Sequence, residues 1–194
     1  MEESNFSATA YDRVYEAGRP ELFFKANPRH CVGHGGVLKL RDDSKWLVPE
    51  PELVLVISAA GKVVGFTIGD DLSCRDIEGE NLLYLPQAKV WDRCCGLGPA
   101  ILLNQSGVQI RESMLSLEIR RDGAVVFQGQ TPISRIKRSF EELIGYLFRN
   151  QTFSNGVLLF TGTGIVPPED FTLKAHDRID MTIPEIGTLT NVVE

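Results

Sequence analysis

The stretch Val48-Pro-Glu-Pro-Glu-Leu-Val-Leu-Val-Ile57 decides how this chain is interpreted, because it places two carboxylates at the head of an extended apolar run. Glu50 and Glu52 are two positions apart, and in a β-strand residues i and i+2 project from the same face. Both carboxylates therefore point toward one place, where all-oxygen ligands would suit a hard divalent cation such as Mg²⁺. The alternative interpretation is the solvated face of an edge strand, with Pro51 between the two acids.

Two later residues are candidates for the same site. Asp71 follows another apolar run and would add a third carboxylate, and Lys89 lies within Leu85-Pro-Gln-Ala-Lys-Val-Trp91. A third acid and a nearby lysine would turn a metal site into a reaction centre. Taken alone, Asp71 also fits a turn position, and Lys89 also fits an ordinary surface lysine.

The chain as a whole predicts a mainly β domain. One amphipathic helix is expected after Pro132, with Ser134 as its N-cap and apolar residues at helical spacing from Ile136 to Phe148. Gly61-Lys62 and Asp122-Gly123 indicate tight hairpin turns. Residues 72–88 show neither helical nor strand periodicity and are expected to form an irregular functional segment. The expected strands are Val37–Leu40, Glu52–Ala59, Val63–Ile68, Pro99–Leu103, Leu115–Arg120, Ala124–Phe127, Val157–Phe160, Arg178–Ile183 and Leu189–Val193.

Composition narrows the class of protein. The chain has 194 residues, 43% of them hydrophobic and 24% charged, as in an ordinary globular domain. The net charge is −6 with no basic block, which argues against nucleic acid and anionic membrane surfaces as partners. No apolar run reaches the roughly 18–20 residues of a membrane span, and the first residues do not resemble a signal peptide. The four cysteines form no Cys-x-x-Cys motif. Reduced thiols in a cytoplasmic protein are therefore expected.

A zinc site is the main competing metal hypothesis. His30-Cys31-Val-Gly-His34 brings three potential ligands together, but the neighbouring glycines disfavour a helix, and no second Cys/His pair completes a tetrahedral set. The hard-cation hypothesis is therefore preferred.

Six blocks of sequence, in order and at matching spacing, resemble the fumarylacetoacetate hydrolase family. The resemblance runs from about residue 11 to the C-terminus. It implies a mixed β-roll or sandwich with few helices, a homodimer, and Mg²⁺, with Mn²⁺ or Ca²⁺ as alternatives. The blocks are Pro20-Glu-Leu-Phe-Phe-Lys25, Pro49-Glu-Pro-Glu-Leu53, Asp71-Leu-Ser-Cys-Arg-Asp76, Gln87-Ala-Lys89, Thr161-Gly-Thr-Gly164 and Ile186-Gly-Thr-Leu-Thr-Asn191.

The resemblance also implies roles for individual residues. Glu50, Glu52 and Asp71 match the family's metal ligands, and Lys89 matches its active-site lysine. Residues expected to approach the substrate are Lys25, Arg75 and Thr163. For Arg75, a purely structural ion pair with its neighbour Asp76 is an equally supported alternative.

Three features depart from the family pattern. Asp70 stands where many relatives carry Asn, and His176 stands where glycine is common. Relatives also carry an upstream domain and a lid with acid/base residues. Residues 1–18 are therefore interpreted as a remnant of that lid, with Glu2 and Glu3 as candidate catalytic residues, and residues 19–194 as a single catalytic domain.

The narrower signature, Asp76-Ile-Glu-Gly-Glu-Asn81 with Leu83-Tyr-Leu-Pro-Gln-Ala-Lys89, resembles the branch of the family that dehydrates 2-keto-3-deoxy sugar acids. The expected activity is a metal-dependent lyase that removes water from a 2-keto-3-deoxy-pentonate. Lys89 would act as base, with its pKa lowered beside the bound cation, or as a hydrogen-bond donor. The alternatives are a C–C hydrolase of acylpyruvate-like diketo acids and an inactive, truncated family member that folds as a dimeric module.

Overall fold

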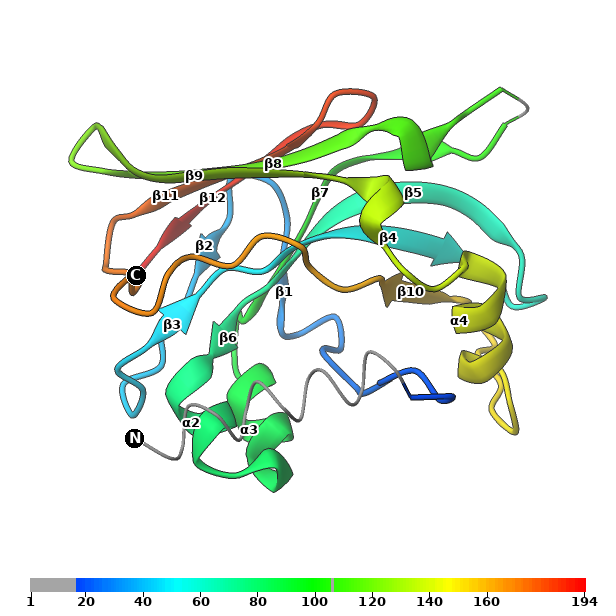
Figure 1. The fold of residues 1–194 in the computed structure, drawn as a ribbon, viewed down its shortest axis with the longest axis horizontal. Coiled ribbons are helices and arrows are strands. Elements are labelled where there is room, and N and C mark those ends of the chain that lie inside the picture. The colour runs from blue at the N-terminus through cyan, green and yellow to red at the C-terminus, as the bar shows by residue number, and fades with distance from the viewer. Residues whose placement is uncertain (1–16, 106) are drawn as a thin grey trace.

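The structure, a computed structural model, describes residues 17–105 and 107–194. Within these residues the fold is built mainly from two five-stranded sheets (Figure 1). In the first sheet, called sheet A, β4 lies between β5 and β10, and β1 runs parallel to β7 at the edge. Its strands are β1 (Cys31–Val32), β4 (Pro51–Ile57), β5 (Val63–Asp71), β7 (Cys95–Leu103) and β10 (Val157–Phe160).

The second sheet, called sheet B, has the order β2-β12-β11-β8-β9. A separate two-stranded ribbon pairs β3 (Leu47–Val48) with β6 (Ser73–Cys74). The strands of sheet B are β2 (Val37–Leu38), β8 (Met114–Arg121), β9 (Ala124–Pro132), β11 (Arg178–Ile183) and β12 (Gly187–Val193).

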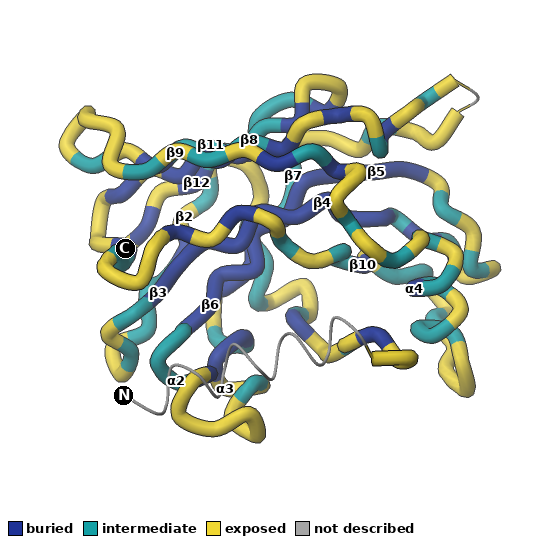
Figure 2. Tube along the Cα trace, viewed as in Figure 1, coloured by how far each residue is buried: buried dark blue, intermediate teal, exposed yellow. Residues whose placement is uncertain are grey.

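The main core lies between the two sheets. In β8 and β11 alternate residues are buried, as expected for strands with one face toward a core. In β4 and β5, by contrast, the burial is nearly continuous, so these strands are covered on both faces (Figure 2). Buried side chains from both sheets share this core, among them Leu53, Leu55, Ile68, Leu117, Ile119, Ile179 and Met181.

The expected strands are all present, and three of them extend at least three residues beyond the expected bounds. β5 continues through Asp70 and Asp71, β7 begins at Cys95, and β9 continues to Pro132. Aspartate, glycine and proline weaken a strand pattern, and pairing with neighbouring strands overrides that weakness here. Both hairpin turns are confirmed: Gly61 connects β4 to β5, and Asp122 and Gly123 connect β8 to β9, all with positive φ.

Two expectations about helices were wrong. Residues 72–88 are not irregular: after β6 they form α2 (Arg75–Glu80), η1 (Leu82–Tyr84) and α3 (Leu85–Lys89), elements too short to show periodicity. The long helix, α4, spans Phe140–Leu147, and Ser139 caps it by accepting a hydrogen bond from the Glu142 N–H at 3.1 Å. Ser134 lies instead in a separate turn, η3 (Ile133–Arg135), which Ile136 ends in a non-helical conformation. A further short turn, η2, spans Ile110–Glu112.

No helix among residues 17–105 and 107–194 is long and apolar enough to cross a membrane. The start of β4 and the ends of β5 and α3 lie close together. Glu50 directly precedes β4, Glu52 lies in β4, Asp71 ends β5 and Lys89 ends α3.

Candidate metal centre

Three carboxylates converge where β4 begins and β5 ends. Each of Glu50, Glu52 and Asp71 is buried, and one oxygen from each lies within 4.8 Å of the others. The sheet produces this arrangement: β4 and β5 are antiparallel, Pro51 is paired with Asp70, and the N–H of Asp71 donates to the Glu50 carbonyl at 3.0 Å. Glu50 and Glu52, at the start of β4, and Asp71, at the end of β5, therefore lie side by side.

A loop after β10 holds one of these acids in place. The N–H of Gly162 donates to Oε2 of Glu52. The next residue back, Thr161, binds the Leu53 carbonyl through its N–H at 3.2 Å and its hydroxyl at 2.8 Å. The Thr161-Gly-Thr-Gly164 block is thus docked on β4 and contacts the acid cluster through its backbone, and Gly162 adopts a positive φ of 89° there.

Lys89 reaches the cluster from the end of α3. Its ammonium lies 2.8 Å from Oε2 of Glu50 and 3.2 Å from Oδ2 of Asp71, and it donates to the Ser73 hydroxyl at 2.6 Å. Burial disfavours the charged form, but the carboxylates of Glu50 and Asp71 outweigh it, so the pKa of Lys89 is raised. Lys89 is therefore an ammonium ion at neutral pH in this arrangement.

Glu50 and Glu52 hold their protons to a higher pH than free carboxyl groups do. Burial raises the pKa of Glu50 and, more strongly, of Glu52, and the nearby charge of Asp71 acts in the same direction. Like charges held this close are costly, and a divalent cation among them would offset that cost. An all-carboxylate donor set of this kind fits a hard cation such as Mg²⁺.

Asp70 lies beside the cluster but outside it. Successive strand residues face opposite sides, so its carboxyl points away from that of Asp71. One oxygen accepts from the Glu50 N–H at 3.2 Å, and within the described residues the other, Oδ2, has no hydrogen-bond partner. Burial is the main cause that raises the pKa of Asp70, to about 8.

Residues 4–194 match the family described as "Fumarylacetoacetate (FAA) hydrolase C-terminal". This chain belongs to the fumarylacetoacetate hydrolase family. The mainly β fold with few helices expected from the sequence is thereby confirmed.

Within the family, the chain is similar to two archaeal proteins. It is 46% identical to 2-dehydro-3-deoxy-D-arabinonate dehydratase of Saccharolobus solfataricus over 96% of this chain and 62% of that protein. It is 45% identical to a probable 2-keto-3-deoxyxylonate dehydratase of Haloferax volcanii, over 99% of this chain and 66% of that protein. The chain therefore spans slightly less than two thirds of the length of these relatives.

A solved structure of the family agrees with this fold closely. It is 2-keto-3-deoxy-D-arabinonate dehydratase complexed with magnesium and 2,5-dioxopentanoate, with a TM-score of 0.92 and 46% identity. The match covers 95% of this chain and 66% of that one.

The residues that the family resemblance assigned to substrate contact have partners within the protein. Lys25 lies 2.8 Å from Oδ1 of Asp71, donates to the carbonyls of Leu72 and Lys89 at 3.0 and 2.5 Å, and packs over the Trp91 ring. Burial disfavours its ammonium form, but Asp71 outweighs that and raises the pKa of Lys25. Its three N–H groups are used by these contacts, so Lys25 positions Asp71.

Arg75 and Thr163 lie at the rim of the cluster. Arg75 is 3.1 Å from Oε2 of Glu78 and 3.5 Å from Oε1 of Glu50. Asp76 was the other expected partner of Arg75. Its carboxylate is held instead by the Ser44 hydroxyl, which donates to it at 2.6 Å, and by the Lys45 N–H, which donates at 2.7 Å.

Thr163 is half-buried, and its hydroxyl is 3.1 Å from the Ile165 carbonyl and accepts from the Ile165 N–H at 3.2 Å. Substrate contact by Arg75 or Thr163 stays a prediction. Glu2 and Glu3 lie outside the described residues.

One acid near the site was missed in the sequence. Glu21 is a solvent-exposed residue, yet partial enclosure of its carboxyl and the charge of Glu78 raise its pKa, while Lys89 opposes them. Its position in the Pro20-Glu-Leu-Phe-Phe-Lys25 block, four residues before Lys25, was the available signal. Sequence alone gave no reason to place this loop against α2 and α3.

The zinc hypothesis finds no support in the described residues. The only group of potential ligands that converges there is Glu50, Glu52 and Asp71. His34 instead accepts a hydrogen bond from the Thr190 N–H at 3.1 Å. His176 has a φ of 71°, in the left-handed region that glycine adopts without strain.

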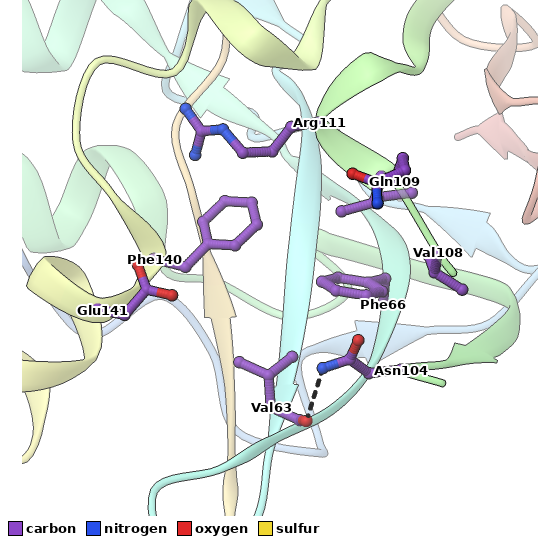
Figure 3. Close-up of a pocket in the computed structure, with 9 residues that line it drawn as sticks. Val63, Phe66, Asn104, Val108, Gln109, Arg111, Phe140 and Glu141 are labelled. Carbon is purple, nitrogen blue, oxygen red and sulfur yellow. Dashed lines mark hydrogen bonds between the residues drawn. The ribbon is translucent and has the colours of Figure 1, made fainter. Parts of the chain in front are cut away.

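A cavity of about 270 Å³ lies at the opposite end of β5 from the acid cluster (Figure 3). Phe66 and Phe140 form its apolar wall, and the Arg111 guanidinium lies 5.0 Å from the Phe140 ring centre. Val63, which lines it, is eight positions from Asp71 along an extended strand, so the cavity is remote from the acid cluster.

Proposed function

We propose that this chain is the catalytic domain of a divalent-metal-dependent hydro-lyase that dehydrates a 2-keto-3-deoxy-pentonate. The observation that carries the proposal is the buried cluster of Glu50, Glu52 and Asp71 with Lys89 against it. The printed activities of the two similar archaeal proteins support the substrate class. The activity is a proposal for the whole protein, because the chain covers 62% and 66% of their lengths.

The three carboxylates would hold the cation, Mg²⁺ in the first instance, with Mn²⁺ or Ca²⁺ as alternatives. When bound, the cation polarises the 2-oxo group of the substrate and makes the proton on C3 more acidic. Magnesium and a dioxo acid are present in the solved structure of a similar dehydratase. The acid cluster of this chain offers the carboxylate oxygens that such a hard cation prefers.

Lys89 would stabilise negative charge as it develops on the substrate. Its ammonium donates to the Ser73 hydroxyl at 2.6 Å and lies 2.8 Å from Oε2 of Glu50, so it is held at the edge of the acid cluster. We propose that it acts there as a hydrogen-bond donor to the substrate. A preorganised buried charge of this kind lowers a barrier more than a solvated one.

Glu21 would move the protons. A carboxyl with a raised pKa and access to solvent suits a general acid/base group. In the proposed reaction Glu21 accepts the C3 proton, the C3–C4 double bond forms, and the C4–O bond breaks as the hydroxyl leaves with a proton as water. The resulting 3-ene then loses a proton from C5 and gains one at C3, which moves the double bond to C4–C5 and gives an enol. Transfer of the enol's hydroxyl proton to C4 gives 2,5-dioxopentanoate, so one water is lost overall.

Other residues would orient the substrate. Arg75 and Thr163 lie at the rim of the cluster, and we propose that they contact the substrate's carboxylate or hydroxyl groups. Lys25 would act through Asp71. Catalytic roles for Glu2 and Glu3, and the division at residue 18, remain part of the proposal that an upstream lid completes the site.

We also propose a homodimer. Leu158, Val56, Gly65 and Leu103 are consecutive partners across four strands of sheet A, so they share one face. Leu103 and Leu158 are 57% and 42% exposed, and with Gly65 between them they form an apolar row that a second copy would cover. The four free cysteines favour a reducing compartment, and we propose the cytoplasm.

The test is to incubate the chain with Mg²⁺ and 2-keto-3-deoxy-D-arabinonate and to measure the aldehyde product with and without a chelator. Chelator-sensitive turnover that is lost in Glu21→Gln would support the proposal. Turnover on a 4-oxo acylpyruvate alone would instead indicate the C–C hydrolase. Mg²⁺ binding without turnover of either substrate would indicate an inactive module.

A further inference from the structure

Cys31 and Cys95 have no role in the proposed activity, and they lie opposite each other on two neighbouring strands at the edge of sheet A. β1 and β7 are parallel, and Cys31 is the direct partner of Cys95. Adjacent strands are about 4.8 Å apart and paired residues project to the same side. This separation falls within the Cα–Cα range of about 4.4–6.8 Å that a disulfide requires. The backbone therefore already presents the two thiols to each other.

The two thiols differ in environment. Cys31 is half-buried at the edge of the sheet, and its Sγ lies 3.4 Å from the Asn27 carbonyl, whereas Cys95 is fully buried. The hydrogen bond to Cys95 is the main cause that lowers the pKa of Cys31 to about 7, and Lys25 acts in the same direction. Because Cys31 is the more exposed of the two, it is the thiol that an oxidant in solution reaches first, and Cys95 is its enclosed partner.

We propose that Cys31 and Cys95 form a reversible oxidation site that a peroxide converts into a disulfide. The Cys31 thiolate attacks hydrogen peroxide, an S–O bond forms, the O–O bond breaks and hydroxide leaves. The sulfur of Cys95 then attacks the sulfenic acid, the S–S bond forms, the S–O bond breaks, and the Cys95 proton leaves with the hydroxyl as water. Two thiols are oxidised, and one peroxide is reduced to two waters.

The other two thiols are less suited to this chemistry. Cys74 is buried on β6 in a separate apolar cluster with Leu47 and Ala88, and burial raises its pKa to about 11. Cys94 is also buried, and burial raises its pKa. No group of cysteines among the described residues converges as metal ligands, so a thiolate metal site does not compete with this assignment.

The pair lies one strand away from the acid cluster. Cys95 is the partner of Cys31 on one side and of Asp71 on the other, so the three residues form a row across β1, β7 and β5. The proposal concerns the thiols alone and does not depend on the proposed lyase activity.

The test uses the full chain, fully reduced, exposed to hydrogen peroxide and then alkylated. The expected result is a mass loss of about 2 Da, the loss of two alkylatable thiols, and full reversal by dithiothreitol. Trypsin should yield residues 30–39 linked to residues 94–111. Because the second peptide contains both Cys94 and Cys95, the Cys94→Ala variant identifies the partner and should still form the bridge.

Two further variants complete the test. Cys31→Ser, at a half-buried position that tolerates serine, should lose the bridge, and Cys74→Ala is the matched control that keeps it. In Cys95→Ala, the Cys31 sulfenic acid should persist and react with dimedone. Peroxide that leaves residues 30–39 and 94–111 unlinked in the parent chain, or a bridge that persists in Cys31→Ser, would overturn the proposal.

Discussion

The ammonium of Lys89 lies 2.8 Å from Oε2 of Glu50, and both side chains are buried. The two residues are 39 positions apart, one at the end of α3 and the other just before β4. A divalent cation bound by Glu50 would compete with Lys89 for the same carboxylate. Cation binding and the availability of the lysine as a hydrogen-bond donor are therefore coupled through Glu50.

Replacing Lys89 with methionine should remove turnover and weaken the fold. We expect turnover to fall by at least about 100-fold. The free energy of unfolding in EDTA should fall by about 3–5 kcal/mol, because Glu50 and Asp71 lose a buried counter-charge. Steady-state kinetics and urea unfolding measure the two effects. Lys62→Met, at an exposed hairpin residue, is the control, and full turnover by Lys89→Met would contradict the assigned role.

Replacing Glu52 with glutamine should abolish most of the Mg²⁺ binding. The change keeps the shape of the side chain but removes the charge that a hard cation requires. We expect the dissociation constant, measured by calorimetry, to rise at least about 100-fold. Glu169→Gln, on an exposed loop, should bind Mg²⁺ as the parent does. Equal affinity in both variants would exclude Glu52 as a ligand.

Mg²⁺ binding should release protons and strengthen as the pH rises. Burial and the charge of Asp71 raise the pKa of Glu50 and Glu52 above 4.5, so these acids retain protons at a pH where free carboxyls have lost them. The cation binds the deprotonated forms. Calorimetry at pH 6 in two buffers of different ionisation enthalpy should therefore give different heats. Identical heats, with an affinity unchanged between pH 6 and pH 8, would contradict this.

Asp70→Asn should stabilise the chain in EDTA, and increasingly so at higher pH. Burial raises the pKa of Asp70 from 3.8 to about 8. Its contribution to the free energy of unfolding is therefore favourable at low pH and is lost as the pH rises through about 8. The variant should gain about 1–3 kcal/mol at pH 8.5 and little at pH 4 in urea unfolding. Asp92→Asn, at an exposed residue, is the control for the change in net charge. If the gain in the free energy of unfolding of Asp70→Asn were the same at both pH values, packing rather than ionisation of the carboxyl would be its cause.

Arg121→Ala should destabilise the fold without affecting the cluster of Glu50, Glu52 and Asp71. Arg121 binds both oxygens of the fully buried Asp177, at 2.8 and 2.7 Å. Removing it leaves that carboxylate without its counter-charge, at a cost of about 3 kcal/mol. Arg120→Ala, at the exposed neighbour, should cost no more than about 0.5 kcal/mol. Urea unfolding of the two variants at neutral pH compares these costs directly.

Sequence reasoning succeeded where the signal was local. Glu50 and Glu52 were placed on one strand face by their spacing alone, and the hairpin turns by Gly61 and Gly123. It failed where short elements depend on their neighbours. Residues 72–88 form α2 and α3, which are too short to show a helical period. Ser134 and Ser139 are both suitable N-cap residues. The helix begins after Ser139 because the backbone at Ile136 is not helical.

The sequence by itself determined the family, the mainly β fold and the set of acids, because strand periodicity and carboxylate spacing are properties of neighbouring residues. Only the tertiary structure decided which groups face those acids. It turned Asp70 away from them, placed Lys25 on Asp71 and Lys89 on Glu50, and brought Glu21 and the Cys31–Cys95 pair to their edges. The physical reason is that charge interactions and desolvation depend on distance through space, which only the packed sheets define.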